Sequence, residues 1–161
     1  MSERPPIEKQ GIILAADLLR FSAYVKEHGD LPTIALLDRF YRACEAAILP
    51  AGEIFKFIGD GVLARFPEES AGLAQEAAQK LSQFGDLPAA IGLHFGSYWE
   101  AAIGLKGAPD IFGETVNRAF MLPKQEGIWA SADFFSKLSD DKRVGWKSNG
   151  DDVFVLATAS P

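Results

Sequence analysis

Two aspartates stand where a carboxylate is costly unless it is paired or binds a metal ion. Asp17 ends the apolar run 11–16, and Asp60 sits between two short apolar runs, in a Gly-Asp-Gly sequence at 59–61. Two carboxylates at one end of a sheet would suit Mg²⁺, which prefers one or two carboxylates together with substrate phosphates. Each residue also has a plain structural interpretation, Asp60 as turn chemistry and Asp17 as a charge at a helix N-terminus.

The elements that must position these aspartates alternate between strands and helices. Residues 11–16 are predicted as a buried strand, and the Asp-Gly pair between runs 53–58 and 62–66 predicts a hairpin. Apolar residues at helical spacing predict a helix over 31–49 that buries Ile34, Leu37, Tyr41, Cys44 and Ile48. Further strands are predicted at 88–95, 97–105, 128–130 and 153–156, and helices at 67–84, 113–121 and 131–138, the last capped by Ser131. Residues 18–22 are predicted as a turn into another helix, for which Ser22 is a candidate N-cap. This order predicts an α+β fold, a ferredoxin-like βαββαβ sheet with helices on one face.

Composition limits the class of protein. With 161 residues, 48% of them apolar, the chain is expected to form one folded domain over 11–157, with a flexible lead-in at 1–10 and a tail at 158–161. A net charge of −6 argues against nucleic-acid binding, and a single cysteine excludes an internal disulfide. Neither a signal peptide nor a long apolar run is found, so we expect no membrane association and a cytoplasmic location.

Five segments, in order, resemble motifs of the class III nucleotidyl cyclases. They are ILAADLLRFSAY (13–24), IFKFIGDGVLARF (54–66), AIGLHFG (90–96), PDIFGETVNRAFML (109–122) and GIWAS (127–131). The resemblance extends over most of the chain, roughly residues 11–157. It implies the cyclase fold and the activity of an adenylate cyclase, which converts ATP to 3′,5′-cyclic AMP and pyrophosphate.

The resemblance also implies roles for residues near the two aspartates. Asp17, Asp60 and the main-chain carbonyl of Leu18 would hold two Mg²⁺ or Mn²⁺ ions per site. The main-chain amides around Phe21 and Ser22, where a helix begins, would hold phosphate oxygens. Such a site is completed by a second protomer in this family, so the resemblance implies a homodimer with two equivalent sites.

Lys56 and Asp110 match the pair that reads the base in this family. A lysine donates to ring N1 and a carboxylate accepts from the 6-amino group, which suits adenine and leaves guanine with mismatched partners. Asn117 matches the residue that orients the ribose, and Lys147 either binds the triphosphate or is an ordinary surface lysine.

The chain departs from the family pattern at positions that usually carry positive charge. Met121 stands where the family has its transition-state arginine, four residues after Asn117, and such an arginine is worth roughly 10³–10⁵ in rate. Arg118 is expected to be a poor substitute, since it is rotated about 100° from Asn117 on a helix. Arg20 is the candidate replacement, because it lies beside the phosphate loop. Ser97 stands where some relatives place a phosphate-binding arginine.

Three functions therefore remain open from the sequence. The first is a minimal, slow adenylate cyclase, acting alone or under a separate regulatory protein. The second is an inactive pseudo-cyclase that binds a nucleotide or dimerises, which Met121 and Ser97 favour. The third is a cyclase that makes cyclic CMP or UMP, against which Lys56 and Asp110 argue. His94 is interpreted as structural and Cys44 as inert core.

Overall fold

The fold is described from a computed structural model, over residues 4–104, 106–123 and 125–157. An eight-stranded sheet organises it, with the order β2-β3-β1-β4-β6-β8-β7 and β5 paired to β4. The strands are β1 (Ile7–Leu18), β2 (Glu53–Ile58), β3 (Gly61–Phe66), β4 (Ala89–Ala102), β5 (Pro109–Phe112), β6 (Gly127–Ser131), β7 (Trp146–Ser148) and β8 (Val153–Leu156). The helices are α1 (Phe21–His28), α2 (Asp30–Ile48), the 3₁₀ turn η1 (Glu68–Ser70), α3 (Ala71–Ser82), α4 (Glu114–Met121) and α5 (Ala132–Phe135).

The first half of the chain confirms the predicted ferredoxin-like unit. Strands β2, β3, β1 and β4 lie side by side in that order and are antiparallel throughout. Strand β6 then adds to β4 in parallel, and β8 and β7 continue the sheet. The predicted tail, 158–161, lies outside the described residues. Among the described residues, no helix is long and apolar enough to cross a bilayer.

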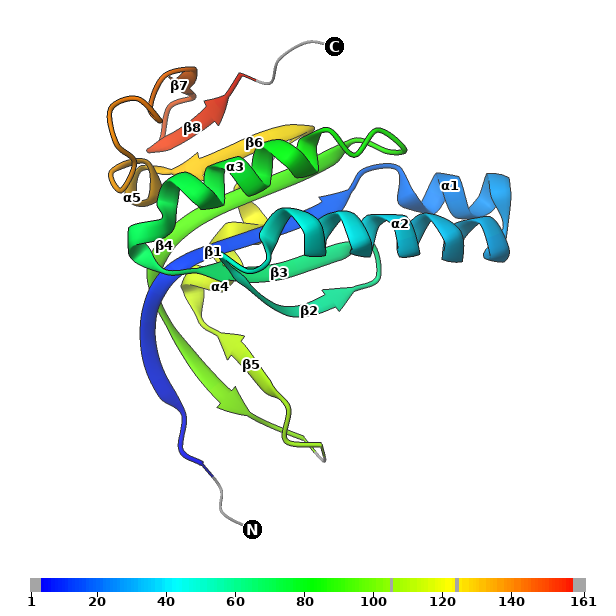
Figure 1. The fold of residues 1–161 in the computed structure, drawn as a ribbon, viewed down its shortest axis with the longest axis horizontal. Helices are drawn as coiled ribbons and strands as arrows, with labels where there is room; N and C mark the ends of the chain where they lie inside the picture. The colour runs from blue at the N-terminus through cyan, green and yellow to red at the C-terminus, as the bar shows by residue number, and fades with distance from the viewer. Residues whose placement is uncertain (1–3, 105, 124, 158–161) are drawn as a thin grey trace.

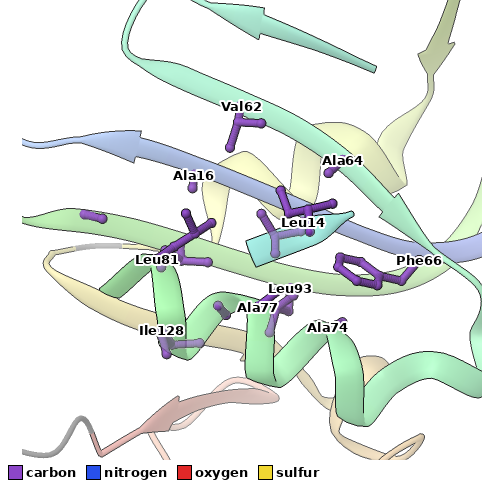
Figure 2. Close-up of a cluster of buried hydrophobic side chains, with 14 of the residues drawn as sticks. Leu14, Ala16, Val62, Ala64, Phe66, Ala74, Ala77, Leu81, Leu93 and Ile128 are labelled. Atoms are coloured by element: carbon purple, nitrogen blue, oxygen red, sulfur yellow. The ribbon is translucent and has the colours of Figure 1, made fainter. Parts of the chain in front are cut away.

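Both faces of the sheet are covered, so the prediction of helices on one face is only partly right. Alternate residues of β1 face opposite ways: Leu14 packs with α2 and α3, while Ile13 and Ala15 pack beneath α4. Figure 1 shows α2 and α3 in front of the strands and α4 behind them. Figure 2 shows the larger core, where Leu14 meets β3 and the alanine-rich face of α3.

Two glycines of β4 explain why α4 can lie on the second face. A Cβ at Gly92 would be 1.9 Å from the carbonyl oxygen of Ala119 in α4, and one at Gly96 would be 2.6 Å from Oγ1 of Thr115. No side chain fits in either gap, so the helix backbone rests almost directly on the strand. The buried side of α4, with Val116 and Ala119, is thereby held against the sheet, and its other side is turned outward.

Several boundaries differ from the sequence predictions. Strand β1 begins at Ile7, so the predicted lead-in is already ordered sheet from that residue, paired with β4. Runs 88–95 and 97–105 form one long strand, β4, up to Ala102, whereas Leu105 lies outside the described residues. Strands β5 and β7 were not predicted. Helix α1 starts at Phe21, with Arg20 at the N-cap position, so Ser22 lies inside the helix and does not cap it.

The buried face of α2 is also offset from the prediction. Cys44 and Ile48 are buried as expected, and burial raises the pKa of the Cys44 thiol to about 12, which keeps it inert. Earlier in the helix, however, Leu36 and Phe40 are buried in place of the predicted residues, and Ile34 is 61% exposed. The predicted cap of α5 is confirmed, because the Ser131 hydroxyl oxygen accepts from the Phe134 amide at 3.2 Å.

The contact between α4 and β4 predicts that Gly92→Ala destabilises the fold by about 3 kcal/mol or more, the upper end of overpacking costs. The added methyl group would overlap the Ala119 carbonyl. Gly72→Ala in α3 is the matched control: its nearest neighbour is the flexible Lys142 side chain at 3.5 Å, and alanine in a helix should stabilise by up to about 1 kcal/mol. Urea unfolding measures both, and a Gly92→Ala protein as stable as the parent would contradict the packing described.

Candidate active site

The structure brings the two predicted metal-binding aspartates together. Antiparallel pairing of β1 with β3 sets Asp17 opposite Gly61, the residue that directly follows Asp60. The amide of Leu18 donates to the main-chain carbonyl of Asp60 at 3.1 Å, which ties the end of β1 to the hairpin turn. The two carboxylates therefore stand at the same end of the sheet, as the sequence predicted.

A tyrosine that sequence reasoning assigned to the core holds this turn. The Tyr41 hydroxyl on α2 donates to the carbonyl of Gly59 at 2.5 Å, and its ring stacks on Phe57 with ring centroids 3.9 Å apart. Gly59, with φ of 55°, takes the left-handed conformation that this two-residue turn needs. The two turn residues are therefore Gly59 and Asp60 rather than the predicted Asp-Gly pair. The hydrogen bond from Tyr41 to Gly59 ties the turn that carries Asp60 to α2.

The electrostatics of the aspartate pair suit a bound cation. Burial, and then repulsion from Asp60, raise the pKa of Asp17, and burial raises the pKa of Asp60. Within the described ranges no cluster of three or more His, Cys, Asp or Glu side chains is placed to hold a metal ion. Two carboxylates with nearby carbonyls such as that of Leu18 are a small donor set, which fits Mg²⁺ or Mn²⁺ sharing its coordination with phosphate oxygens and water.

The main chain after β1 offers hydrogen-bond donors next to this pair. Arg20 adopts a left-handed conformation with φ of 61°, and α1 begins at the next residue. The first hydrogen bond inside α1 runs from the Tyr24 amide to the Arg20 carbonyl at 3.0 Å. The amides of Phe21 and Ser22 thus belong to the first turn, where helices leave donors free for an anion.

Lys56 and Asp110 form a direct ion pair across 54 residues of sequence. Lys56 Nζ lies 2.5 Å from Asp110 Oδ2, and Asp110 Oδ1 accepts from the Ile111 amide at 2.8 Å. A β-bulge after Ile54 brings Lys56 opposite Leu63, which packs in the cluster beneath α4. The pair thus lies on the α4 face of the sheet, and it presents a lysine donor beside a carboxylate acceptor.

A cavity of about 660 Å³ opens beside the outward side of α4. We call it the α4 cavity. Asn117, Arg118 and Met121 all line it from the helix, and His94, Trp129 and the 149–151 loop line it from the sheet side. The expectation that Arg118 turns away from Asn117 is therefore wrong. Positions 117, 118 and 121 fall within one stripe of a helix, because residues three and four apart are surface neighbours.

The other two positively charged residues that the sequence singled out, Lys147 and Arg20, do not line the α4 cavity. Lys147 is exposed on β7, and only the 149–151 loop that follows it lines the cavity. Arg20 lines a separate, smaller cavity of about 350 Å³ with Leu19 and Pro88. The carbonyl oxygen of Ser97, in β4, accepts a hydrogen bond from the Thr115 hydroxyl at 2.5 Å. Ser97 therefore helps to hold α4 against the sheet.

Comparisons with known proteins agree on one fold. No family model matches the chain. Photoactivated adenylate cyclase subunit beta of Euglena gracilis is 34% identical over 80 residues, which is 49% of this chain and 9% of that protein. The photoactivated adenylate cyclase subunit beta-like protein ST- of the same organism is 29% identical over 116 residues, 62% of this chain and 14% of that protein. The chain therefore corresponds to a small part of these relatives.

Solved structures match nearly the whole chain. A bacterial light-regulated adenylyl cyclase superimposes with a TM-score of 0.83 at 21% identity, over 95% of this chain and 53% of that one. The catalytic core of a rhodopsin-guanylyl cyclase with converted specificity, in complex with ATPαS, superimposes with a TM-score of 0.80 at 17% identity, over 98% of this chain and 100% of that one. The chain has the fold of the class III nucleotidyl cyclase catalytic domain.

Proposed function

We propose that the chain is a nucleotidyl cyclase that converts ATP to 3′,5′-cyclic AMP and pyrophosphate. The observation that carries the proposal is that Asp17 and Asp60 lie at the same end of the sheet, with Asp17 opposite Gly61, close to the first-turn amides of α1. In this reaction the ribose 3′-oxygen attacks the α-phosphorus, the 3′-hydroxyl loses its proton, and pyrophosphate leaves with the electron pair of the broken P–O bond. The site must therefore hold a polyanion and stabilise charge that builds on oxygen.

Metal binding would fall to Asp17, Asp60 and the Leu18 carbonyl. Two bound Mg²⁺ or Mn²⁺ ions would supply Lewis acidity at the attacking and leaving oxygens. Both carboxylates have raised pKa values, so their ionised forms gain more from a cation than two solvated surface carboxylates would. The amides of Phe21 and Ser22 would donate to phosphate oxygens from the start of α1.

Base recognition would fall to the ion pair on the α4 face. In this proposal Lys56 Nζ donates to adenine N1, and Asp110 accepts from the 6-amino group. Guanine carries a hydrogen on N1 and an oxygen at position 6, so both contacts would become mismatched and leave polar groups unpaired. The 2.5 Å contact between Lys56 and Asp110 supports this role, because it already sets a donor and an acceptor side by side.

The site would be shared between two copies of the chain. The α4 cavity is lined by Asn117 and Arg118 but by neither metal-binding aspartate, so one chain carries two separate half-sites. A two-fold pairing would set the aspartates of one protomer against the α4 cavity of its partner and would form two equivalent sites. Asn117 would then orient the ribose from the opposite protomer.

An inactive, nucleotide-binding pseudo-cyclase is the second candidate. Met121 favours it, because this side chain lines the α4 cavity and is 69% exposed where the cyclase pattern has an arginine. Such a protein would keep the metal pair and the base pair, yet it would bind nucleotide without turning it over.

Turnover separates the two candidates. We expect the purified chain with Mn²⁺ to form cyclic AMP from ATP, identified by mass, and to discriminate against GTP, CTP and UTP. Asp60→Ala should abolish product, whereas Asp38→Ala, which removes an exposed carboxylate of α2, should leave the rate unchanged. A cyclic pyrimidine product would overturn the base assignment. The absence of product from all four nucleotides, in a folded dimer, would favour the pseudo-cyclase.

The aspartate pair also predicts that Asp60→Asn raises the melting temperature without metal and lowers it, relative to the parent, when metal is present. The folded-state pKa of Asp60 is raised, so its ionisation lowers the stability of the fold as pH rises from the ordinary value of 3.8 through the raised value. At neutral pH without metal, Asp60→Asn should therefore unfold at a higher temperature than the parent. This gain should vanish below about pH 3.8, where the carboxyl is protonated in both states.

With added Mn²⁺ the parent should unfold at the higher temperature instead, because the ion binds only the parent and raises its melting temperature. Asp38→Asn should respond to Mn²⁺ as the parent does. Equal Mn²⁺ shifts in Asp60→Asn and in the parent would place the metal ion elsewhere.

A further inference from the structure

His94 is a buried polar side chain that the proposed reaction leaves unused. It lies in the middle of β4, is 6% exposed, and lines the α4 cavity together with Asn117 and Arg118. Sequence reasoning assigned it to structure alone. Its hydrogen bonds indicate a second role.

A hydrogen bond to Ser131 orients the His94 ring. His94 Nδ1 lies 2.5 Å from the Ser131 hydroxyl oxygen, which also accepts from the Phe134 amide at 3.2 Å. A hydroxyl has one proton and two acceptor lone pairs, so it can donate to Nδ1 or accept from it. When the hydroxyl donates to Nδ1, the proton of the neutral ring lies on Nε2.

His94 lines the α4 cavity. Its Nδ1 is engaged with the Ser131 hydroxyl. Among the described residues no hydrogen-bond partner of Nε2 is found, so Nε2 is the ring nitrogen that remains for a ligand in this cavity.

Burial, more than neighbouring charge, favours the neutral form of the His94 ring. Burial is the largest cause that lowers the pKa of His94, followed by the Arg118 guanidinium, while Asp133 on α5 acts in the opposite direction. Glu114 and Asp151 also line the cavity, but both are exposed to solvent. The wall of the cavity thus places a buried imidazole beside a cationic side chain.

We propose that His94 binds the substrate, with its Nε2–H donating to a phosphate oxygen of the nucleotide in the α4 cavity beside Arg118. A fixed donor next to a guanidinium suits an anionic oxygen, which forms the strongest hydrogen bonds of this kind. Because the Ser131 hydroxyl is itself held by the first turn of α5, the orientation of the His94 ring is set before the ligand arrives. The identity of the ligand as a nucleotide rests on the proposed function.

The chain has only two histidines, so the proposal can be tested directly by NMR. Long-range ¹H–¹⁵N spectra of the full chain should show a protonated Nε2 and a bare Nδ1 for His94. Pyrophosphate, the probe, should shift the His94 signals and raise the His94 pKa, because a nearby anion favours the charged ring. His28 is the internal control: it is exposed at the end of α1, stacked on Tyr24, and should not respond.

A surface variant tests the partner of His94 without touching the core. Arg118→Met should weaken pyrophosphate binding by at least about tenfold, the effect of losing a charged hydrogen bond, and should raise the His94 pKa in the free protein. Arg42→Met, which removes an exposed arginine from α2, should change neither quantity.

His94 signals that do not move up to millimolar pyrophosphate, or a proton found on Nδ1, would overturn the proposal. The turnover assay separates this outcome from a failure of the proposed function. Cyclic AMP formation with an unresponsive His94 would leave the cyclase intact and remove His94 from it. A responsive His94 in a protein without turnover would support phosphate binding in the α4 cavity and argue against catalysis.

Discussion

The close approach of α4 to β4 is the constraint on which the rest of the site depends. With glycine at 92 and 96, the helix backbone contacts the strand directly, and the Thr115 hydroxyl donates to the Ser97 carbonyl at 2.5 Å. One side of α4 is thereby sealed against the sheet. Four exposed residues of its other side, Glu114, Asn117, Arg118 and Met121, line the α4 cavity, and His94 lines it from the strand below.

The two halves of the candidate site differ in their electrostatic state. Lys56 and Asp110 form an ion pair with one another, so the half that we propose reads the base has its charges balanced without a ligand. Asp17 and Asp60 repel, and their raised pKa values show that the folded chain resists their ionisation. The fold thus gives up stability at the two residues that we propose bind the metal ions, and such a local loss of stability is common in functional sites.

Local patterns predicted the elements near the aspartates well. The β2–β3 hairpin and the limits of α2 follow from turn residues and periodicity. The hairpin, once paired with β1, places Asp60 at the same end of the sheet as Asp17. The face of α2 was predicted wrongly because its N-terminal half carries apolar residues on both sides, and Ile34 stays exposed while Leu36 is buried. Periodicity alone cannot show where a helix leaves the sheet.

The parts that sequence could not show depend on contacts between distant segments. Strand β5 has four residues and exists only by pairing with β4, so nothing local marks it, although it carries Asp110. Two strands were predicted, at 88–95 and 97–105, whereas the strand is unbroken and Gly96 is the position where Thr115 lies against it. The contact between His94 and Ser131 spans 37 residues and has no signature in either segment.

Helix α1 has a consequence for how the site is ordered. It projects beyond the sheet in Figure 1, and none of its residues is fully buried. Helices with so little buried surface open locally at low free energy and exchange their amide hydrogens quickly. The amides that would hold phosphate thus belong to one of the least protected segments of the fold. In the proposed function, ligand binding would be coupled to completion of this helix, so part of the binding energy would be spent on ordering the site.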